Sequence, residues 1–370
     1  MPKRTSESSL HEALRFSLGG WRITILPLLA AALILDLMGR HPVLVFAISA
    51  LALVALAGLL GHATEALAGH IGAAAGGLLN AALGNLTELI IGILALERGE
   101  IEVVKASITG SIVGDLLLVF GLAAFVGGLG VEKLTFSSVA VGANTSMLFL
   151  AVVALVMPAL FQLSVFGGLA SSGPRIESLS FWTAGILLAS YASSLIFMLK
   201  THRRSFRGDL DPTGPRLSRG AALASLVAAA ILVAVASEIL VSRIADVTAT
   251  LGWTQLFIGV VVVAIAGNAA EHSTAILAAR AGRMDLALHT AVGSSTQIAL
   301  FVAPLLVLVS RGFAAPMSLV FHPLEIAAVI LSVGAVVVVS VDGETNWLEG
   351  LQLIGVYAIL AVFFYVVPAS

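Results

Sequence analysis

The sequence predicts an all-α polytopic membrane protein with about eleven transmembrane helices. Hydrophobic residues make up 59% of the 370 residues and charged residues only 11%, against roughly 25% charged in ordinary soluble domains. Apolar stretches long enough to cross a bilayer recur along the chain, separated by charged residues and by Pro and Gly. A soluble core cannot absorb this much apolar sequence, whereas a bundle of membrane helices requires it.

The apolar runs define the expected spans. The first run follows a basic N-terminal segment, and we interpret it as a retained helix because no small-residue cleavage site follows it. The one long polar segment, residues 200–220, contains Pro212 and Pro215 and is not expected to be helical. The expected span limits are 23–38, 43–68, 73–96, 103–126, 137–160, 179–199, 221–241, 256–279, 286–309, 322–341 and 347–367.

These spans predict a duplicated organisation. We expect a cytoplasmic N-terminus with an extra first helix (1–42), a five-helix repeat (43–199), a basic cytoplasmic linker (200–220) and a second five-helix repeat (221–370). With the N-terminus inside, thirteen of the 19 Lys and Arg residues fall in cytoplasmic segments, which favours this orientation and an external C-terminus. Five is an odd number, so the repeats must cross the membrane in opposite senses. Such inverted repeats are typical of secondary transporters with midplane sites.

A short motif occurs once in each repeat, near the middle of an apolar span. It reads Gly84-Asn85-Leu86-Thr87-Glu88 and Gly267-Asn268-Ala269-Ala270-Glu271. A Gly-Ser pair follows each motif at one distance, since 26 residues separate Asn85 from Ser111 and Asn268 from Ser294. Carboxylates inside a membrane are costly, so a duplicated one indicates a cation or proton pathway. Pairing with Lys or Arg is the alternative, but the central parts of the spans contain neither.

The side chains around the two motifs offer oxygen and no sulfur. Hard oxygen donors suit Ca²⁺ or a similar cation, and we predict Glu88 and Glu271 as the Ca²⁺ ligands. The Gly before each Asn is expected to weaken the helix and to free backbone carbonyls. Amides and hydroxyls also join helices without binding ions, and Gly76, Gly77 and Gly110 are interpreted as close-packing positions. The remaining candidate cation and proton ligands are Asn85, Asn268, Ser111, Ser294, Gln297 and Asp115.

Other titratable residues lie nearer the span ends. Glu65 and Glu238 are expected near opposite mouths, where they either relay protons and gate access or are simply solvated. His272 follows Glu271 and so points to another face of the helix, which favours a hydrogen-bonded packing role. Solvated or structural roles are expected for Asp36, Glu325 and Asp342.

A mechanism follows from the predicted ligands. A carboxylate without a counter-charge in a low dielectric tends to hold a proton, and a divalent cation reverses that preference. The same oxygens then bind either Ca²⁺ or protons, which couples the two. No nucleotide-binding loop is present, so an ion gradient is the expected driving force, and no cofactor is expected beyond the transported ions.

Several other classes are disfavoured. A passive cation channel needs continuous weak sites rather than a few deep ones. An enzyme is not expected, because no His-Glu-x-x-His or Gly-x-Ser-x-Gly motif occurs, and no basic or aromatic pattern indicates nucleic acid. The chain has no cysteine, which excludes disulfides and thiolate metal sites.

Lipid-facing and protomer-facing apolar surfaces look alike, so a homo-oligomer in the lipid bilayer is compatible with the sequence.

At these residues the chain resembles the calcium/proton exchanger (CAX) family of the calcium/cation antiporter superfamily. The resemblance implies an extra first helix, two inverted five-helix repeats and Ca²⁺ transport driven by protons. It also implies that Glu88 and Glu271 form the cation and proton site with neighbouring Asn, Ser and Gln residues, and that Glu65 and Glu238 act in proton transfer and gating. The matching motifs run from about residue 60 to the C-terminus: Gly77-Leu78-Leu79-Asn80, Gly84-Asn85, Glu88-Leu89-Ile90, Gly110-Ser111-Ile112, Leu116-Leu117-Leu118, Gly267 to His272, Gly293 to Gln297, Phe321 with Glu325, and Asp342-Gly343.

Three features refine the resemblance. The family usually has Asn where this chain has Asp115, so a third acid is expected at the site, with effects on affinity, proton stoichiometry or selectivity. The linker is basic rather than acidic as in many eukaryotic members, which favours a prokaryotic plasma membrane protein. A sodium-coupled calcium/cation exchanger is the main alternative, although such relatives carry a Gly-Thr-Ser-x-x-Glu repeat that this chain lacks.

Overall fold

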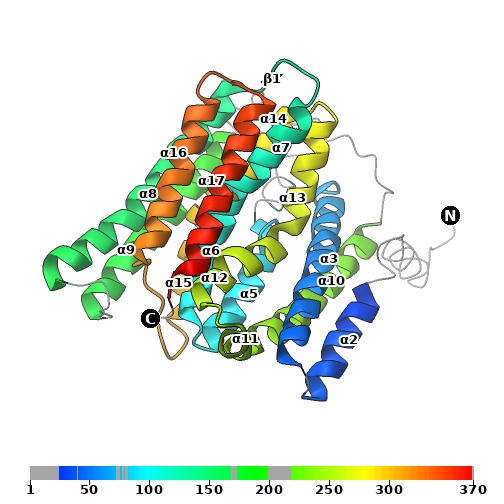
Figure 1. Cartoon of the computed structure of the whole chain (residues 1–370), viewed down its shortest axis with the longest axis vertical. Helices are drawn as coiled ribbons and strands as arrows, with labels where there is room; N and C mark the ends of the chain where they lie inside the picture. Colours follow the sequence, from blue (N-terminus) through cyan, green and yellow to red (C-terminus); the bar gives the residue numbers. More distant parts are fainter. Residues whose placement is uncertain are drawn as a thin grey trace. The chain divides into compact units, whose positions relative to one another are not determined.

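A computed structural model gives the fold of the chain and describes residues 25–39, 41–71, 76, 79, 82–167, 173–198 and 218–368. Within these residues the regular structure is helical except for one antiparallel ribbon of two short strands, β1 (Leu134–Thr135) and β2 (Glu344–Thr345) (Figure 1). Nine helical stretches in the described part of the chain are long and apolar enough to cross a membrane. The predicted all-α polytopic class is therefore confirmed.

The chain divides into two compact units, and each takes segments from both halves of the sequence. Unit 1 comprises Met1–Leu94, Asp209–Trp253 and Ala266–Ala270. Unit 2 comprises Ala95–Gly208, Thr254–Ile265 and Glu271–Ser370.

Unit 1 is organised around a long helix pair. Its helices are α2 (Ile25–Leu37), α3 (Pro42–Ala68), most of α5 (Leu86–Glu97), α10 (Arg219–Ser242) and α11 (Ile244–Leu251). The pair α3 and α10 makes the most extensive helix contact, and α2 packs on α3 (Figure 1). Small residues such as Ala221 and Ala222 are fully buried at one end of this pair, against Ala66 and Leu67. Small side chains allow close helix packing in membranes, where burial alone drives little association.

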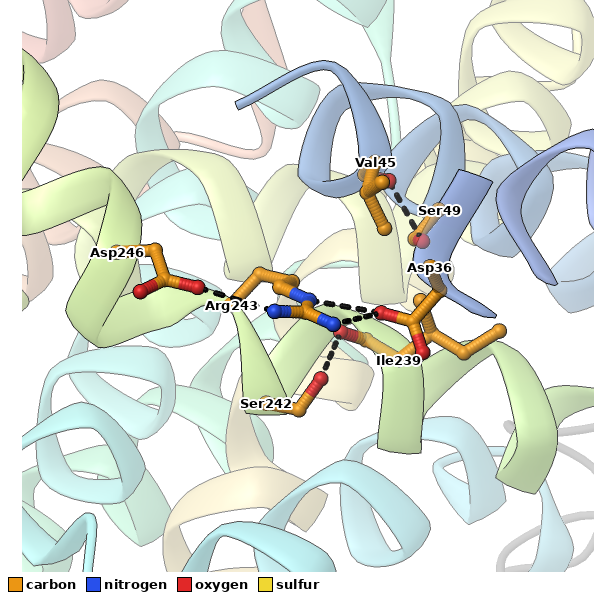
Figure 2. Close-up of polar contacts among 7 residues, drawn as sticks. All are labelled: Asp36, Val45, Ser49, Ile239, Ser242, Arg243 and Asp246. Carbon is orange, nitrogen blue, oxygen red and sulfur yellow. Dashed lines mark hydrogen bonds and ion pairs between the residues drawn. The ribbon is translucent and has the colours of Figure 1, made fainter. Parts of the chain in front are cut away.

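An arginine ties the extra first helix to this pair. Arg243 lies at the break between α10 and α11, and its Nε donates to Asp36 Oδ1 at the end of α2 over 2.7 Å (Figure 2). Its Nη1 also donates to Asp246 Oδ2 over 3.2 Å. Asp36 therefore has a structural role, one of the two roles expected for it.

Unit 2 contains the remaining described helices. Several spans change between α-helical and π-helical geometry. One runs through α6 (Ile101–Val113), η2 (Gly114–Val119) and α7 (Phe120–Gly128). A second runs through α12 (Gln255–Phe257), η4 (Ile258–Val263) and α13 (Ala264–Arg280), of which residues 266–270 belong to unit 1. A third runs through α14 (Met284–Gln297), η5 (Ile298–Val302) and α15 (Ala303–Ser310), and the other helices are α8 (Ser138–Phe166), α9 (Pro174–Ile196), α16 (Pro323–Ser340) and α17 (Trp347–Val366).

Helices occur at the expected spans in the predicted order, with shifted ends, but within the described residues α2 and α5 are too short to count among the nine that could cross a membrane. Helix α9 begins at Pro174 rather than at 179, because Pro favours the first helical position and Gly173 precedes it. The seventh span continues past 241 as α11, which ends at the left-handed Gly252 (φ 70°). Helix α2 has only 13 residues. The basic N-terminus, most of the 200–220 linker and part of the expected 73–96 span, including Gly77, lie outside the described residues.

Candidate cation-binding residues

The first motif lies in unit 1 at a helix start. Gly84 and Asn85 form a turn, and α5 begins at Leu86. The buried Asn85 accepts the hydrogen bond of Leu89 N at its backbone oxygen over 3.1 Å, and Asn is favoured just before a helix. Glu88 falls in the first turn and is half-buried. The expected helix interruption at the Gly-Asn pair is confirmed for this motif, and the start of α5 stabilises a negative side chain there.

The second motif has a different backbone. Gly267 and Asn268 lie inside α13, which is uninterrupted from Ala264 to Arg280. The expected weakening of the helix at Gly267 is therefore wrong. A glycine inside a helix lowers the stability of the helix by only about 1 kcal/mol relative to alanine. Alanines on both sides of the Gly-Asn pair, among them Ala266 and Ala269, favour a continuous helix.

Within unit 1 the two motifs approach one another. A Cβ placed on Gly267 would lie 3.3 Å from Glu88 Oε1 and 3.8 Å from Ile91 Cδ1. The absence of a side chain at Gly267 therefore leaves room for the Glu88 carboxylate. Asn268 follows directly and is 1% exposed. Unit 1 thus brings the acid of the first motif against the glycine of the second.

In unit 2, α6 and η4 pack backbone to backbone. A Cβ on Gly110 would collide with the backbone of Val260, and one on Gly259 would collide with Ala106. The close-packing interpretation is confirmed for Gly110, and also for Gly76, whose Cβ would lie 2.5 Å from the Ala68 carbonyl oxygen. The buried Ser111 follows Gly110 on the same helix. This contact holds η4 against α6 within unit 2.

Asp115 is held by a histidine within unit 2. It lies on η2, and its Oδ1 is 3.2 Å from His272 Nε2 on α13. When the Asp115 carboxylate is ionised it only accepts hydrogen bonds, and the imidazole Nε2 is then the donor. The Ser294 side chain also hydrogen-bonds the Asp115 carboxylate. The hydrogen-bonded role expected for His272 is confirmed, and three of the singled-out residues come together here.

The other predicted residues are placed as follows. Glu271 on α13 and Gln297, the last residue of α14, are half-buried. Glu65 is exposed near the end of α3, with Oε2 3.8 Å from His62 Nδ1. Glu238 is half-buried within α10. Among the described residues, no group of three or more acidic or histidine side chains is arranged so that it could hold a metal ion.

A buried polar cluster joins α6 to the start of α16, and sequence reasoning does not find it. Glu325 is 1% exposed and accepts hydrogen bonds from Thr109 Oγ1 (3.1 Å) and from His322 N (2.8 Å). Lys105 is buried and donates from Nζ to the Val320 oxygen over 2.9 Å. Glu325 is therefore structural rather than solvated. The sequence signal that could have revealed this cluster is the pair of polar residues Lys105 and Thr109, one turn apart in an apolar span.

Comparison with known proteins identifies the family. A sequence model described as sodium/calcium exchanger protein matches residues 41–200 and 221–366. The chain belongs to the sodium/calcium exchanger family. This exchanger is 41% identical to a Ca²⁺/H⁺ antiporter of Synechocystis sp. over 90% of its own length and 93% of the relative. It is 40% identical to the Ca²⁺/H⁺ antiporter ChaA of Bacillus subtilis, over 89% and 94% of the two chains.

A solved structure agrees with this assignment. That of native YfkE superposes on the exchanger with a TM-score of 0.80 at 39% identity, covering 93% of this chain and 100% of the other. The resemblance stated from the sequence motifs is confirmed, and the exchanger is a multi-pass membrane protein.

Proposed function

We propose that this exchanger is a secondary active antiporter that moves Ca²⁺ against protons by alternating access. Relatives named Ca²⁺/H⁺ antiporters are similar to it over about nine-tenths of both chains. The observation that carries the proposal is the position of the Glu88 carboxylate, which lies in an apolar stretch predicted to cross the membrane and against the glycine of the second motif. A carboxylate at such a position is a functional residue by default.

Glu88 and Glu271 are proposed as the acids that bind Ca²⁺ and protons in turn. The neutral oxygen ligands are proposed to be Asn85, Asn268, Ser111, Ser294 and Gln297, and Asp115 is a third acid beside them. Two acids with several neutral oxygens suit Ca²⁺, which takes six to eight oxygen ligands. Proton relay or gating is proposed for Glu65 and Glu238, which lie toward the ends of α3 and α10 and outside the two motifs.

Exchange follows from competition for the same oxygens. A carboxylate that holds a proton is a poor ligand, so Ca²⁺ binding must release protons from the acids. The protein binds Ca²⁺ and protons alternately, and the proton gradient supplies the driving force. It then acts as a transporter and not as an enzyme.

The proposed location is a prokaryotic plasma membrane with the N-terminus inside and the C-terminus outside. The bacterial relatives and the excess of Lys and Arg in the expected cytoplasmic segments support it. The protein's partners are then the lipid bilayer and its ions, Ca²⁺ and protons.

The experiment is Ca²⁺ uptake into proteoliposomes that contain the purified chain and are acidic inside. Uptake should follow the imposed proton gradient without sodium and should change little when sodium is added. Uptake that ignores the proton gradient and follows a sodium gradient would support a sodium-coupled exchanger instead. Protein-free liposomes provide the baseline.

A further inference from the structure

Asp115 and His272 break the internal symmetry of the chain. An offset of 183 residues relates Asn85 to Asn268 and also Ser111 to Ser294. The same offset relates Asp115 to Ile298, and it relates Leu89 to His272. At each of these two positions one repeat has a polar side chain where the other has a buried apolar one.

The two symmetry-breaking residues contact one another. They are 157 residues apart in the chain, yet the Asp115 Oδ1 and His272 Nε2 atoms are 3.2 Å apart in unit 2. The side chains are only 1% and 13% exposed, respectively. A buried carboxylate requires such a partner, because a charge or polar group without one is costly away from water. The contact therefore joins two elements, η2 of the first repeat and α13 of the second.

We infer that Asp115 is a positioning residue, which acts through His272 to fix the Glu271 carboxylate. His272 follows Glu271 directly on α13, so holding the imidazole at Nε2 limits rotation and sliding of the helical turn that presents Glu271. The anchor on η2 is itself stabilised by burial, since the neighbouring Gly114 and Leu116 are buried. The inference rests on the proposed function only in taking Glu271 as a cation-binding residue.

The corresponding position of the first motif cannot form this contact. The residue after Glu88 is the buried, apolar Leu89, which has no side-chain hydrogen-bonding group, and Glu88 lies against Gly267. Loss of the Asp115–His272 contact should disturb Glu271 and leave the surroundings of Glu88 intact.

A double-mutant cycle separates positioning from direct ligation by Asp115. The variants are Asp115→Leu, His272→Leu and the double variant, each measured for the apparent KM for Ca²⁺ and for Vmax in proteoliposomes. We expect each Leu variant to raise KM about tenfold, as for loss of one hydrogen bond to a charged group. The double variant should be no worse than the worse single variant, because both substitutions remove the same contact.

Conservative variants keep the test decisive if a Leu variant folds poorly. Asp115→Asn keeps an acceptor oxygen and His272→Gln keeps a donor. Each should therefore have a KM much closer to the wild-type value than the corresponding Leu variant has. Ser332→Ala is the matched control, because Ser332 is buried on α16 and donates to Ala328 O of its own helix over 2.7 Å. Its KM should equal that of the wild type.

The inference is overturned if Asp115→Leu raises KM while His272→Leu does not, or if the two effects multiply in the double variant. It is also overturned if Asp115→Asn is as impaired as Asp115→Leu, which would make the Asp115 charge itself a ligand. Failure of the proposed function has a different signature, namely wild-type transport that does not respond to protons. In that case the double-mutant cycle is measured again with the ion that does drive transport.

Discussion

The two Gly-Asn-x-x-Glu segments share their key residues but not their backbone. The first is a turn followed by a helix start, with Glu88 in the first turn of α5. The second lies inside the continuous helix α13, directly after the π-helical η4. Glu88 lies against Gly267, whereas Glu271 precedes the histidine that binds Asp115.

This difference shows that a duplicated motif fixes chemical groups and not local structure. Alanines around Gly267 and Asn268 favour a continuous helix, while Leu86 and Thr87 follow the turn at Asn85. In the proposed mechanism each motif supplies oxygen donors to the cation, and either backbone can present them. The two motifs are therefore expected to respond differently to substitutions around their acids, although the proposed mechanism uses both acids.

The largest expected effect is loss of exchange when either acid is neutralised. Glu88→Gln and Glu271→Gln keep size and hydrogen bonding but remove the charge that is proposed to bind the cation. Proton-driven Ca²⁺ uptake should fall to the level of protein-free liposomes in both, with normal membrane insertion. Glu102→Gln is the control, because the Glu102 side chain is 62% exposed. Normal uptake by either variant would remove that acid from the mechanism.

A second prediction concerns the backbone contact between α6 and η4 in unit 2. Gly110→Ala should lower the free energy of unfolding by about 3 kcal/mol, at the upper end for overpacking, because its Cβ meets the Val260 backbone. Gly142→Ala on α8 is the control, since nothing lies within 4 Å of a Cβ there. Thermal melting in detergent measures both. Equal melting temperatures would show that α6 and η4 are not in backbone contact.

A third prediction tests the approach of the two motifs in unit 1. Gly267→Ala places a methyl 3.3 Å from Glu88 Oε1, so the carboxylate must shift slightly. The KM for Ca²⁺ should rise roughly three- to fivefold, about 1 kcal/mol, with little change in melting temperature. An unchanged KM would mean that Glu88 does not need this space during transport.

The smallest expected effect is a pH dependence outside the spans, where α5 leads into α6. Burial raises the pKa of Glu100 above its ordinary 4.5, and nearby Arg98 opposes this. Because the folded pKa is the higher one, this residue's contribution to stability is greatest below pH 4.5 and is lost as pH rises through the folded pKa. In Glu100→Gln that pH-dependent loss should disappear from melting curves. In the wild type Gln255 Nε2 donates to Glu100 Oε2 over 2.7 Å. The amide oxygen of the substituted side chain can still accept this hydrogen bond. Identical pH profiles would contradict the assignment.

The sequence predicts the helical class, the order of the spans and the paired acids, because apolar length and repeated motifs are local signals. It does not predict the π-helical segments η2, η4 and η5, which depend on packing between helices rather than on residue type. It also misses the contacts of Lys105 with Val320 and of Arg243 with Asp36, each joining residues more than 200 positions apart. The partner of His272 is missed for the same reason. One sequence carries no direct signal for such pairs.

The most direct test of the central claim runs the exchange in reverse. Proteoliposomes holding wild-type protein and an internal pH dye are given an outward Ca²⁺ gradient, without sodium and without an imposed pH gradient. The account predicts that Ca²⁺ efflux drives protons inward and acidifies the lumen, and that Glu271→Gln abolishes this signal. Ca²⁺ efflux without any pH change, or efflux that appears only when external sodium is supplied, would contradict it.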